Sequence, residues 1–269
     1  FTRVLHVYLR KPNLLQQIAV CLHASRAMVH NVRMRLVLAS ASPARRATLI
    51  AAGVTPIVQV SSVDEDAVLA ALPGGRAFSG GATTPADEVA ALAAAKCADV
   101  CEALRTPGTN AELPEGEAVL VVGCDSMLEI DGQMLGKPHT PDVARERIRA
   151  MRRTTATLWT GHCAAILAPA SSRQERATQG RTVSASVTRS ASTLVHFGDI
   201  SDAEIDAYVA TGEPLHVAGS FTVDGLGGPF IEGVTGDYHS VVGISLPLLR
   251  SMATELGVFW PHLWDAPRP

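Results

Sequence analysis

A nearly uninterrupted apolar run over residues 117–125 (EAVLVVGCD) closes on a single carboxylate, Asp125. A short apolar run without polar alternation is typical of a central strand in a sheet. The chain therefore has to build a sheet around this strand, with the Asp125 carboxylate at the strand's mouth. In α/β sheets this is the place where ligand sites gather.

The rest of the chain intermingles predicted strands and helices. Residues 35–39 predict a short buried strand, and Ser42 with Pro43 opens a helix that ends near Gly53. An Asp-Gly pair at 131–132 predicts a β-hairpin. Further strands are predicted over 56–63, 157–168 and 183–197, with two short ones in 217–247, and further helices over 86–104, 141–152, 201–212 and 247–257. This order indicates one α/β domain around a mixed, elongated sheet.

The two ends of the chain lack this pattern. Residues 1–33 carry basic side chains and no acid, since the first acidic residue is Asp64. Two interpretations fit such a segment: an Arg-rich transit peptide, or upstream sequence from a mis-set start. We predict a leader outside the fold at 1–33, a domain at 34–258 and a loose tail at 259–269.

Composition excludes two classes of partner. The net charge is −3, so no broad basic field is present for duplex nucleic acid. No apolar run reaches the roughly 18 residues that span a bilayer, so no membrane segment is expected. The five cysteines form no CxxC pair, which favours reduced, buried thiols in a cytoplasmic protein. The histidines follow no metal-binding spacing, and His162, His196, His216 and His239 are interpreted as packing or surface residues.

The first motif that carries chemistry is LASASPARRATL, residues 38–49. It leads from a strand into a helix N-terminus, where free N–H groups favour an anion. Arg45 and Arg46 lie in the first turn and can bind phosphate oxygens in a bidentate manner, while Ser40 and Ser42 add hydroxyl donors. The alternative is ordinary helix capping with two solvated arginines.

Two further motifs supply carboxylates and a lysine. Asp125 can hold Mg²⁺ or accept a proton from water, and Lys137 returns to the same region after the hairpin. Lysine there would neutralise charge on a phosphate under attack. The acidic cluster Asp64, Glu65 and Asp66 follows a predicted strand, and it is either a metal site or a solvated loop.

The last motif is glycine-rich and spans residues 216–247. So many glycines in an apolar stretch imply tight turns and close backbone approach, which suits a base or ribose lying against the main chain. A glycine-rich hairpin packed on a sheet is the structural alternative.

Together these elements resemble the Maf family of nucleotide pyrophosphatases, also described as septum-formation inhibitors. The similarity runs from about Leu36 to Arg250. The matching motifs, in order, are LASASPAR (38–45), AAAKCA around Lys96, CDS (124–126), GKP (136–138), TG (160–161) and AGSFTVDGLGGPFIEGVTGDYHSVVGISLP (218–247). No single motif is specific, but six in one order are.

The resemblance implies a single domain around an elongated, mixed, strongly twisted sheet flanked by helices. It also implies a hydrolase that depends on Mg²⁺ or Mn²⁺ and cuts a nucleoside triphosphate to the monophosphate and pyrophosphate, and it suggests a homodimer. Asp125 would be the proton acceptor, and Glu65 would join it at the metal. Arg45, Lys96 and Lys137 would surround the triphosphate, and the family triplet places Ser126 beside the substrate.

One difference from many family members bears on the base. Ala44 stands where many members have the first of two arginines, so that Arg45 and Arg46 follow. This Ser-Pro-x-Arg-Arg form resembles the branch that acts on N7-methylguanosine triphosphate. The glycine-rich ending carries Asp224 where the thymidine and uridine branch has Gln. The triplet at 124–126 fits neither branch fully, so the base stays open. A non-catalytic nucleotide-binding regulator of cell division is the alternative function.

Overall fold

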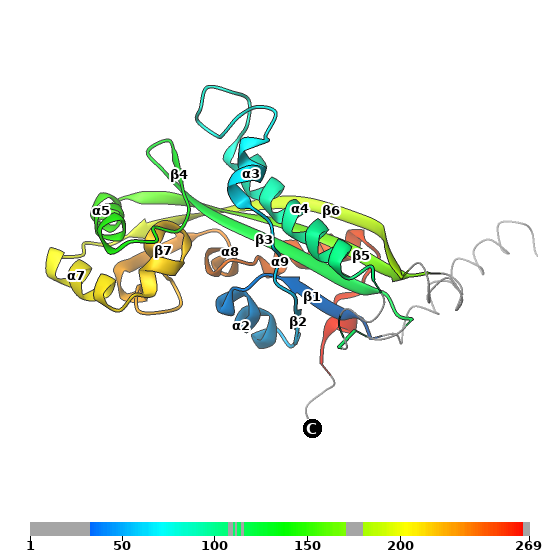
Figure 1. Cartoon of the computed structure of the whole chain (residues 1–269). Coiled ribbons are helices and arrows are strands. Elements are labelled where there is room, and N and C mark those ends of the chain that lie inside the picture. The colour runs from blue at the N-terminus through cyan, green and yellow to red at the C-terminus, as the bar shows by residue number, and fades with distance from the viewer. Residues whose placement is uncertain (1–32, 107–109, 111, 114–115, 171–179, 266–269) are drawn as a thin grey trace, which may run out of the picture. The chain divides into compact units, whose positions relative to one another are not determined.

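The computed structural model describes residues 33–106, 110, 112–113, 116–170 and 180–265 (Figure 1). The predicted leader at 1–33 lies outside these residues, except for Arg33. A seven-stranded sheet has the strand order β2-β1-β3-β5-β6-β7, with β4 paired to β3. The strands are β1 (Arg35–Ala39), β2 (Ile57–Val58), β3 (Val119–Ile130), β4 (Gln133–Leu135), β5 (Thr155–Pro169), β6 (Arg181–Phe197) and β7 (Ile231–Thr235).

The sheet is mixed, as predicted, because β1 pairs in parallel with β2 and β3 while the other pairs are antiparallel. The helices that flank it are α2 (Pro43–Ala51), α3 (Glu65–Ala70), α4 (Pro85–Ala103), α5 (Pro141–Met151), α7 (Asp202–Ala210), α8 (Tyr238–Val242) and α9 (Leu246–Glu255), with short 3-10 helices η1 (Glu213–His216), η2 (Ala218–Ser220), η3 (Gly228–Phe230) and η4 (Trp260–Leu263). Within the described part of the chain, no helix has the length and apolar character required to cross a bilayer.

Alternate residues of β3 face two separate cores. Leu120 and Val122 join a cluster built with α2 and α9, whereas Val119 and Val121 join a cluster built with α4. This period of two is the strand geometry that the apolar run requires when both faces are covered. The prediction of a central strand is confirmed.

The edge of β3 opposite β5 is left open over four residues. On that edge β1 pairs with Val119–Gly123 and β4 pairs with Leu128–Ile130, so no strand among the described residues pairs there with residues 124–127. The prediction that Asp125 ends its strand is wrong: β3 continues to Ile130, because β5 pairs with it as far as Glu129. The strand that ends is β1, and its end exposes the β3 edge beside Asp125.

Helix α4 lies in direct contact with the sheet. A side chain at Gly161 of β5 would place its Cβ 1.9 Å from the Val89 carbonyl oxygen, and one at Gly123 of β3 would place it 2.4 Å from that of Ala93. Only glycine permits this approach at the two positions. The close packing brings Lys96 of α4 over β3.

Two predicted elements differ from the structure. The predicted strand 56–63 pairs only at Ile57 and Val58, and Asp64 instead caps α3 by accepting a hydrogen bond from the Ala67 N–H at 3.0 Å. The glycine-rich segment holds one strand, β7, together with short helices rather than two strands. Positive φ angles at Gly219 (70°) and Ser220 (63°) turn the chain there, which prevents a second strand.

The predicted loose tail is wrong for residues 259–265. Leu263 is buried in the core beneath α9, and the Met34 N–H donates to the His262 carbonyl at 2.9 Å. The Asp265 carboxylate accepts hydrogen bonds from the backbone and hydroxyl of Thr55. Apolar packing of Leu263 and Trp260 therefore extends the ordered domain to Asp265, while residues 266–269 lie outside the described part.

Candidate active site

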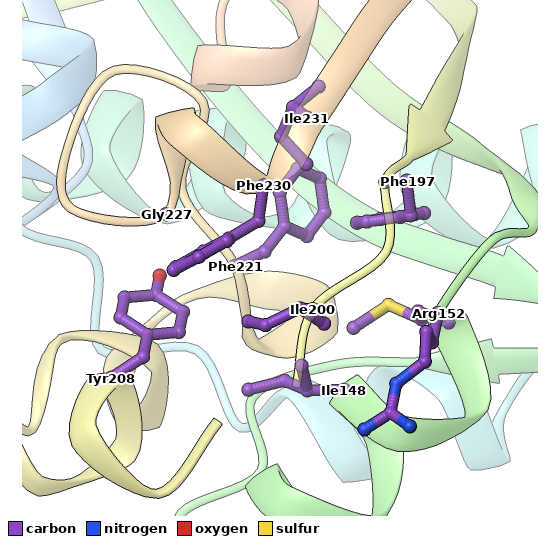
Figure 2. Close-up of a pocket in the computed structure, with 11 residues that line it drawn as sticks. Ile148, Arg152, Phe197, Ile200, Tyr208, Phe221, Gly227, Phe230 and Ile231 are labelled. Atoms are coloured by element: carbon purple, nitrogen blue, oxygen red, sulfur yellow. The ribbon is translucent and has the colours of Figure 1, made fainter. Parts of the chain in front are cut away.

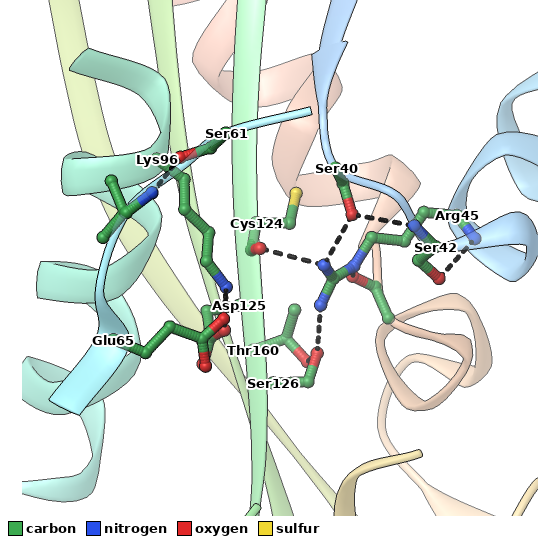
Figure 3. Close-up of polar contacts among 12 residues, drawn as sticks. Ser40, Ser42, Arg45, Ser61, Glu65, Lys96, Cys124, Asp125, Ser126 and Thr160 are labelled. Carbon is green, nitrogen blue, oxygen red and sulfur yellow. Dashed lines mark hydrogen bonds and ion pairs between the residues drawn. The ribbon is translucent and has the colours of Figure 1, made fainter. Parts of the chain in front are cut away.

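Two carboxylates and one ammonium meet at the open edge of β3. Lys96 Nζ lies 2.6 Å from Asp125 Oδ1 and 2.6 Å from Glu65 Oε1 (Figure 3). The three side chains come from α4, β3 and α3. The sequence placed Glu65 after a strand, whereas the structure places it in the first turn of α3.

Burial raises and Lys96 lowers the pKa of both carboxylates, but the net shift is upward for Asp125 and downward for Glu65. Asp125 is 9% exposed, and its burial raises its pKa even though the charges of Lys96 and Arg45 oppose the shift. Burial would also raise the pKa of Glu65, but its hydrogen bond and attraction to Lys96, together with Lys137 and Arg45, lower that pKa overall. Asp125 is therefore the better proton acceptor of the pair.

Arg45 approaches the same stretch of β3 from the side of α2, opposite to Lys96 (Figure 3). Its Nε donates to the Gly243 carbonyl at 2.8 Å, and Nη1 donates to Ser40 Oγ and to the Cys124 carbonyl at 3.0 and 2.9 Å. Its Nη2 donates to Ser126 Oγ at 3.1 Å. Acceptors within the protein thus take all but one of the N–H groups of the Arg45 guanidinium, and the remaining N–H can donate to a ligand.

A hydroxyl relay continues from Arg45 across β5. Thr160 Oγ1 donates its hydrogen to the Ser240 carbonyl at 3.0 Å, so the Ser126 hydroxyl must donate to Thr160, 3.1 Å away. Ser126 Oγ in turn accepts from Arg45. The arginine and the relay tie α2, β3, β5 and α8 into one unit, and Ser126 is part of this support.

The N-terminus of α2 offers the hydrogen-bond donors that the sequence predicted. Ser42 caps the helix by accepting from the Arg45 N–H, and Ser40 Oγ accepts from the Ser42 N–H, so both hydroxyls keep their own hydrogen for a ligand. Arg46 is exposed and lines a surface pocket that also contains Ser40 and Ser42. Of the two arginines, Arg46 has the freer guanidinium.

Lys137 reaches the open edge through the register of the hairpin. Asp131 and Gly132 form its turn with φ angles of 50° and 70°, which confirms the predicted β-hairpin. Leu135 pairs with Leu128, and the chain then runs back along β3 toward Ser126. Lys137 is exposed, and its charge contributes to lowering the pKa of Glu65.

Asp224 is a predicted site residue that neither contacts this cluster nor lines the pocket at the N-terminus of α2, within the part of the chain that the structure describes. It is exposed in the loop after Phe221, and it makes no hydrogen bond with another described residue. The Glu213 carboxylate shapes this loop by accepting from the Thr222 hydroxyl at 2.5 Å and from the Leu226 and Gly227 N–H groups at 3.2 Å.

Similarity to known proteins identifies the family of this chain. A family model described as "Maf-like protein" matches residues 35–256. The chain belongs to the Maf family. Proteins named "Nucleoside triphosphate pyrophosphatase" are similar to it: one from Nocardia farcinica is 49% identical over 233 residues, covering 86% of this chain and 97% of the relative. One from Rhodococcus jostii is 50% identical (85% and 95% covered), and one from Streptomyces coelicolor is 47% identical (88% and 98% covered).

The donor set of this Maf chain can hold a magnesium or manganese ion if a triphosphate supplies the remaining ligands. Glu65 and Asp125 supply hard oxygen ligands, yet no third His, Cys, Asp or Glu joins them among the described residues. Mg²⁺ is commonly bound by one or two carboxylates plus substrate phosphates, so two are sufficient when a triphosphate completes the shell. Lys96 now bridges the two carboxylates and would have to release them.

Several residues that support the Maf site through hydrogen bonds were not predicted from the sequence. His162 was interpreted as a packing or surface residue, and it is indeed fully buried, but it also makes two hydrogen bonds. Thr160, Gly243 and Glu213 were not singled out as site residues. Polar residues inside an apolar strand, such as Thr160 and His162, were the available signal, since buried polar groups have to be hydrogen-bonded.

His162 joins β5 to the start of α9 in its neutral form. The Ser245 N–H donates to Nε2 at 2.8 Å, so Nε2 carries no hydrogen and Nδ1 must donate to the Thr160 carbonyl at 3.2 Å. Burial lowers the pKa of His162 to about 4. Above pH about 6.5 the residue is neutral whether the protein is folded or unfolded, so it contributes no pH dependence there.

Acidification should therefore destabilise the Maf domain through His162. Between pH about 6.5 and about 4 only the unfolded chain binds this proton, and the loss of folding free energy should reach on the order of 3 kcal/mol at the lower end. Urea unfolding at several pH values checks this. His162→Gln should flatten the slope, whereas the exposed control His216→Gln should not. An unchanged slope in His162→Gln would contradict the assignment.

A second, apolar pocket lies apart from the Maf site. Figure 2 shows it lined by Ile148, Phe197, Phe221 and Phe230 among others. Phe197 and Phe221 meet edge to face, with ring centroids 4.9 Å apart. None of the predicted site residues lines this pocket, which is a gap in the apolar core between α5, α7 and the strand ends.

Proposed function

We propose that this Maf chain hydrolyses a nucleoside triphosphate to the monophosphate and pyrophosphate, acting on the nucleotide pool. The observation that carries the proposal is the buried carboxylate of Asp125, held 2.6 Å from Lys96 at the open edge of β3. The names of the relatives point to the same reaction. A non-catalytic regulator would need the cations but no buried proton acceptor, so the enzyme is favoured.

Each side chain has a distinct task in this proposal. Asp125 accepts the proton of the water that attacks the α-phosphorus. Lys96 and Lys137 stabilise the charge that develops as pyrophosphate leaves. Arg46, Ser40 and Ser42 bind phosphate oxygens at the N-terminus of α2. Arg45 and Ser126 support the site by holding in place the edge of β3 that faces the substrate.

A divalent cation, Mg²⁺ or Mn²⁺, belongs to the proposal through Glu65 and Asp125. Bound there with the triphosphate, it would neutralise phosphate charge. The supporting observation is the oxygen chemistry of the two carboxylates, which lie on either side of one ammonium. We also propose that the chain forms a homodimer and acts in the cytoplasm. Free, buried Cys97, Cys101, Cys124 and Cys163 suit a reducing compartment.

A nucleotide panel tests the activity. Pyrophosphate release should be measured with guanosine, N7-methylguanosine, uridine and thymidine triphosphates, each with Mg²⁺, with Mn²⁺ and with a chelator. We expect turnover with at least one base and loss of turnover with the chelator. Binding of nucleotides without any pyrophosphate release would favour the regulator.

The base is proposed to be of the guanine type. Guanine presents N1–H and an N2 amino group as adjacent donors, which a carboxylate accepts, whereas uracil and thymine present one N–H between two carbonyls. Asp224 is exposed in its loop, and Glu213 holds that loop in shape. A carboxylate on a shaped loop can discriminate between bases because a mismatched base leaves polar groups unpaired.

Replacing the carboxylate of Asp224 with an amide should shift this preference. In Asp224→Gln the ratio of kcat/KM for guanosine to uridine triphosphate should fall by about 10-fold, the effect of one or two hydrogen bonds. The exposed acid Glu232 provides a matched control as Glu232→Gln. A wild-type preference for uridine or thymidine triphosphate that survives Asp224→Gln would remove Asp224 from base recognition.

A further inference from the structure

The loop that carries Lys137 is fixed at both ends. At its start, the Gly136 carbonyl accepts two hydrogen bonds, from Arg147 Nη1 at 2.8 Å and from the Gly219 N–H at 3.3 Å. At its end, the Thr140 N–H donates to the Pro138 carbonyl at 2.7 Å, and Thr140 caps α5. Between these anchors the Lys137 side chain stands exposed.

Gly219 is itself pressed against β3 close to the site. Its φ is 70°, and a Cβ there would lie 2.7 Å from a methyl group of Leu128. Leu128 is the β3 residue that pairs with Leu135 just before the loop. The donor from Gly219 is therefore held rigidly by backbone that only glycine can supply here.

Arg147 is unusual because it is half-buried without an acidic partner. Within the described residues no carboxylate lies within ion-pair distance of its guanidinium, and burial lowers its pKa although the more distant charge of Glu146 opposes the shift. Its neighbours on α5 behave differently: Arg145 pairs with Asp142 and Asp206, and Arg149 pairs with Asp202. A cation that loses water without gaining a counter-ion is destabilising on its own.

The hydrogen bond from Arg147 is also not required to satisfy the Gly136 carbonyl, because Gly219 already donates to it. What the second donor adds is restraint on the direction in which the chain leaves Gly136, one residue before Lys137. Small displacements of a catalytic group cost a large part of its effect, so such a restraint has functional value.

We propose that Arg147 is a positioning residue for Lys137. Its guanidinium holds the Gly136 carbonyl so that the ammonium of Lys137 stays beside the open edge of β3, to which the hairpin register returns the chain. The inference rests on the proposed function, in which Lys137 stabilises the charge of the leaving pyrophosphate. Arg147 itself touches no reacting atom in this account.

A double-mutant cycle on the full chain tests the coupling. The variants are Arg147→Met, which keeps the apolar stem, Lys137→Ala, and the two combined; Arg149→Met on the same helix is the control. We expect Arg147→Met to lower kcat about 10-fold with KM and melting temperature little changed. In the Lys137→Ala background, Arg147→Met should lower kcat by less than about 2-fold, because the effect of Arg147 on kcat passes through Lys137.

Two further measurements keep the outcomes separate. Arg147→Lys retains an N–H donor, so it should recover most of the lost kcat, and Arg147→Leu, which also lacks the donor, replaces Arg147→Met if that variant unfolds. Equal losses of kcat in both backgrounds, or wild-type kcat in Arg147→Met while Lys137→Ala is impaired, would overturn the positioning role alone. Wild-type kcat in Lys137→Ala would instead reject the role proposed for Lys137, and the inference with it.

Discussion

Asp125→Asn should keep the fold and lower turnover by about 10²-fold or more, the scale for loss of a positioned base. The amide has the same shape as the carboxylate, and its oxygen can still accept a hydrogen bond from Lys96, which also retains its contact with Glu65 at 2.6 Å. What disappears is the ability to accept a proton and one negative charge at the open edge of β3. Pyrophosphate release under saturating nucleotide measures the effect.

The matched control is Asp131→Asn at the tip of the β3–β4 hairpin. Asp131 is exposed and has a positive φ of 50°, a conformation that asparagine adopts readily, so this variant should behave like the wild type. Thermal unfolding of both variants shows whether each is folded. A folded Asp125→Asn protein with near-wild-type turnover would remove Asp125 from the role of proton acceptor.

Arg45→Lys should impair both stability and catalysis. Lysine has no planar fork and cannot reach the four acceptors that Arg45 joins, so Ser40, Ser126 and the carbonyls of Cys124 and Gly243 lose their donor. We expect the free energy of unfolding to fall by roughly 2–4 kcal/mol. We expect kcat to fall about 10²-fold, because the β3 edge loses its support from α2 and α8.

The variant Arg46→Lys, at the next residue, distinguishes the structural role of Arg45 from substrate binding by Arg46. Arg46 is exposed at the pocket of α2, so its substitution should leave stability unchanged and should act on KM. Urea unfolding and steady-state kinetics of both variants provide the comparison. The division of roles between the two arginines is incorrect if Arg45→Lys has wild-type stability and only a raised KM.

The fold was largely accessible from the sequence because its signals are local. The apolar run before Asp125, the Ser42-Pro43 helix start and the Asp-Gly hairpin each follow from nearby residues, and each is present in the structure. The errors arose where partners are distant. The end of the apolar run does not end β3, because pairing with β5 continues the strand to Ile130.

The same distinction applies to the site. Family motifs pointed to Asp125, Lys96 and Glu65, and the structure brings these three together. The support around Arg45 was inaccessible, because its acceptor at Gly243 is 198 residues away and is a backbone carbonyl, which leaves no side-chain signal. Leu263 was missed for a related reason: the apolar residues of the tail (Phe259, Trp260, Leu263 and Trp264) are interrupted by Pro261 and are too few to give a periodicity.

The contact of α4 with Gly123 and Gly161 divides the site into a wall that cannot be altered and a wall that can. Any side chain at Gly161 would push against the Val89 carbonyl and lift α4, and Lys96 would move away from Asp125 with it. The opposite wall is held to β3 by the apolar packing of α2 and by the four hydrogen bonds of Arg45, but its exposed side chains, such as Arg46, take no part in that support. Redesign for another nucleotide should therefore sample the exposed residues of α2 and the surrounding loops, and leave Arg45 and the surface between α4 and the sheet unchanged.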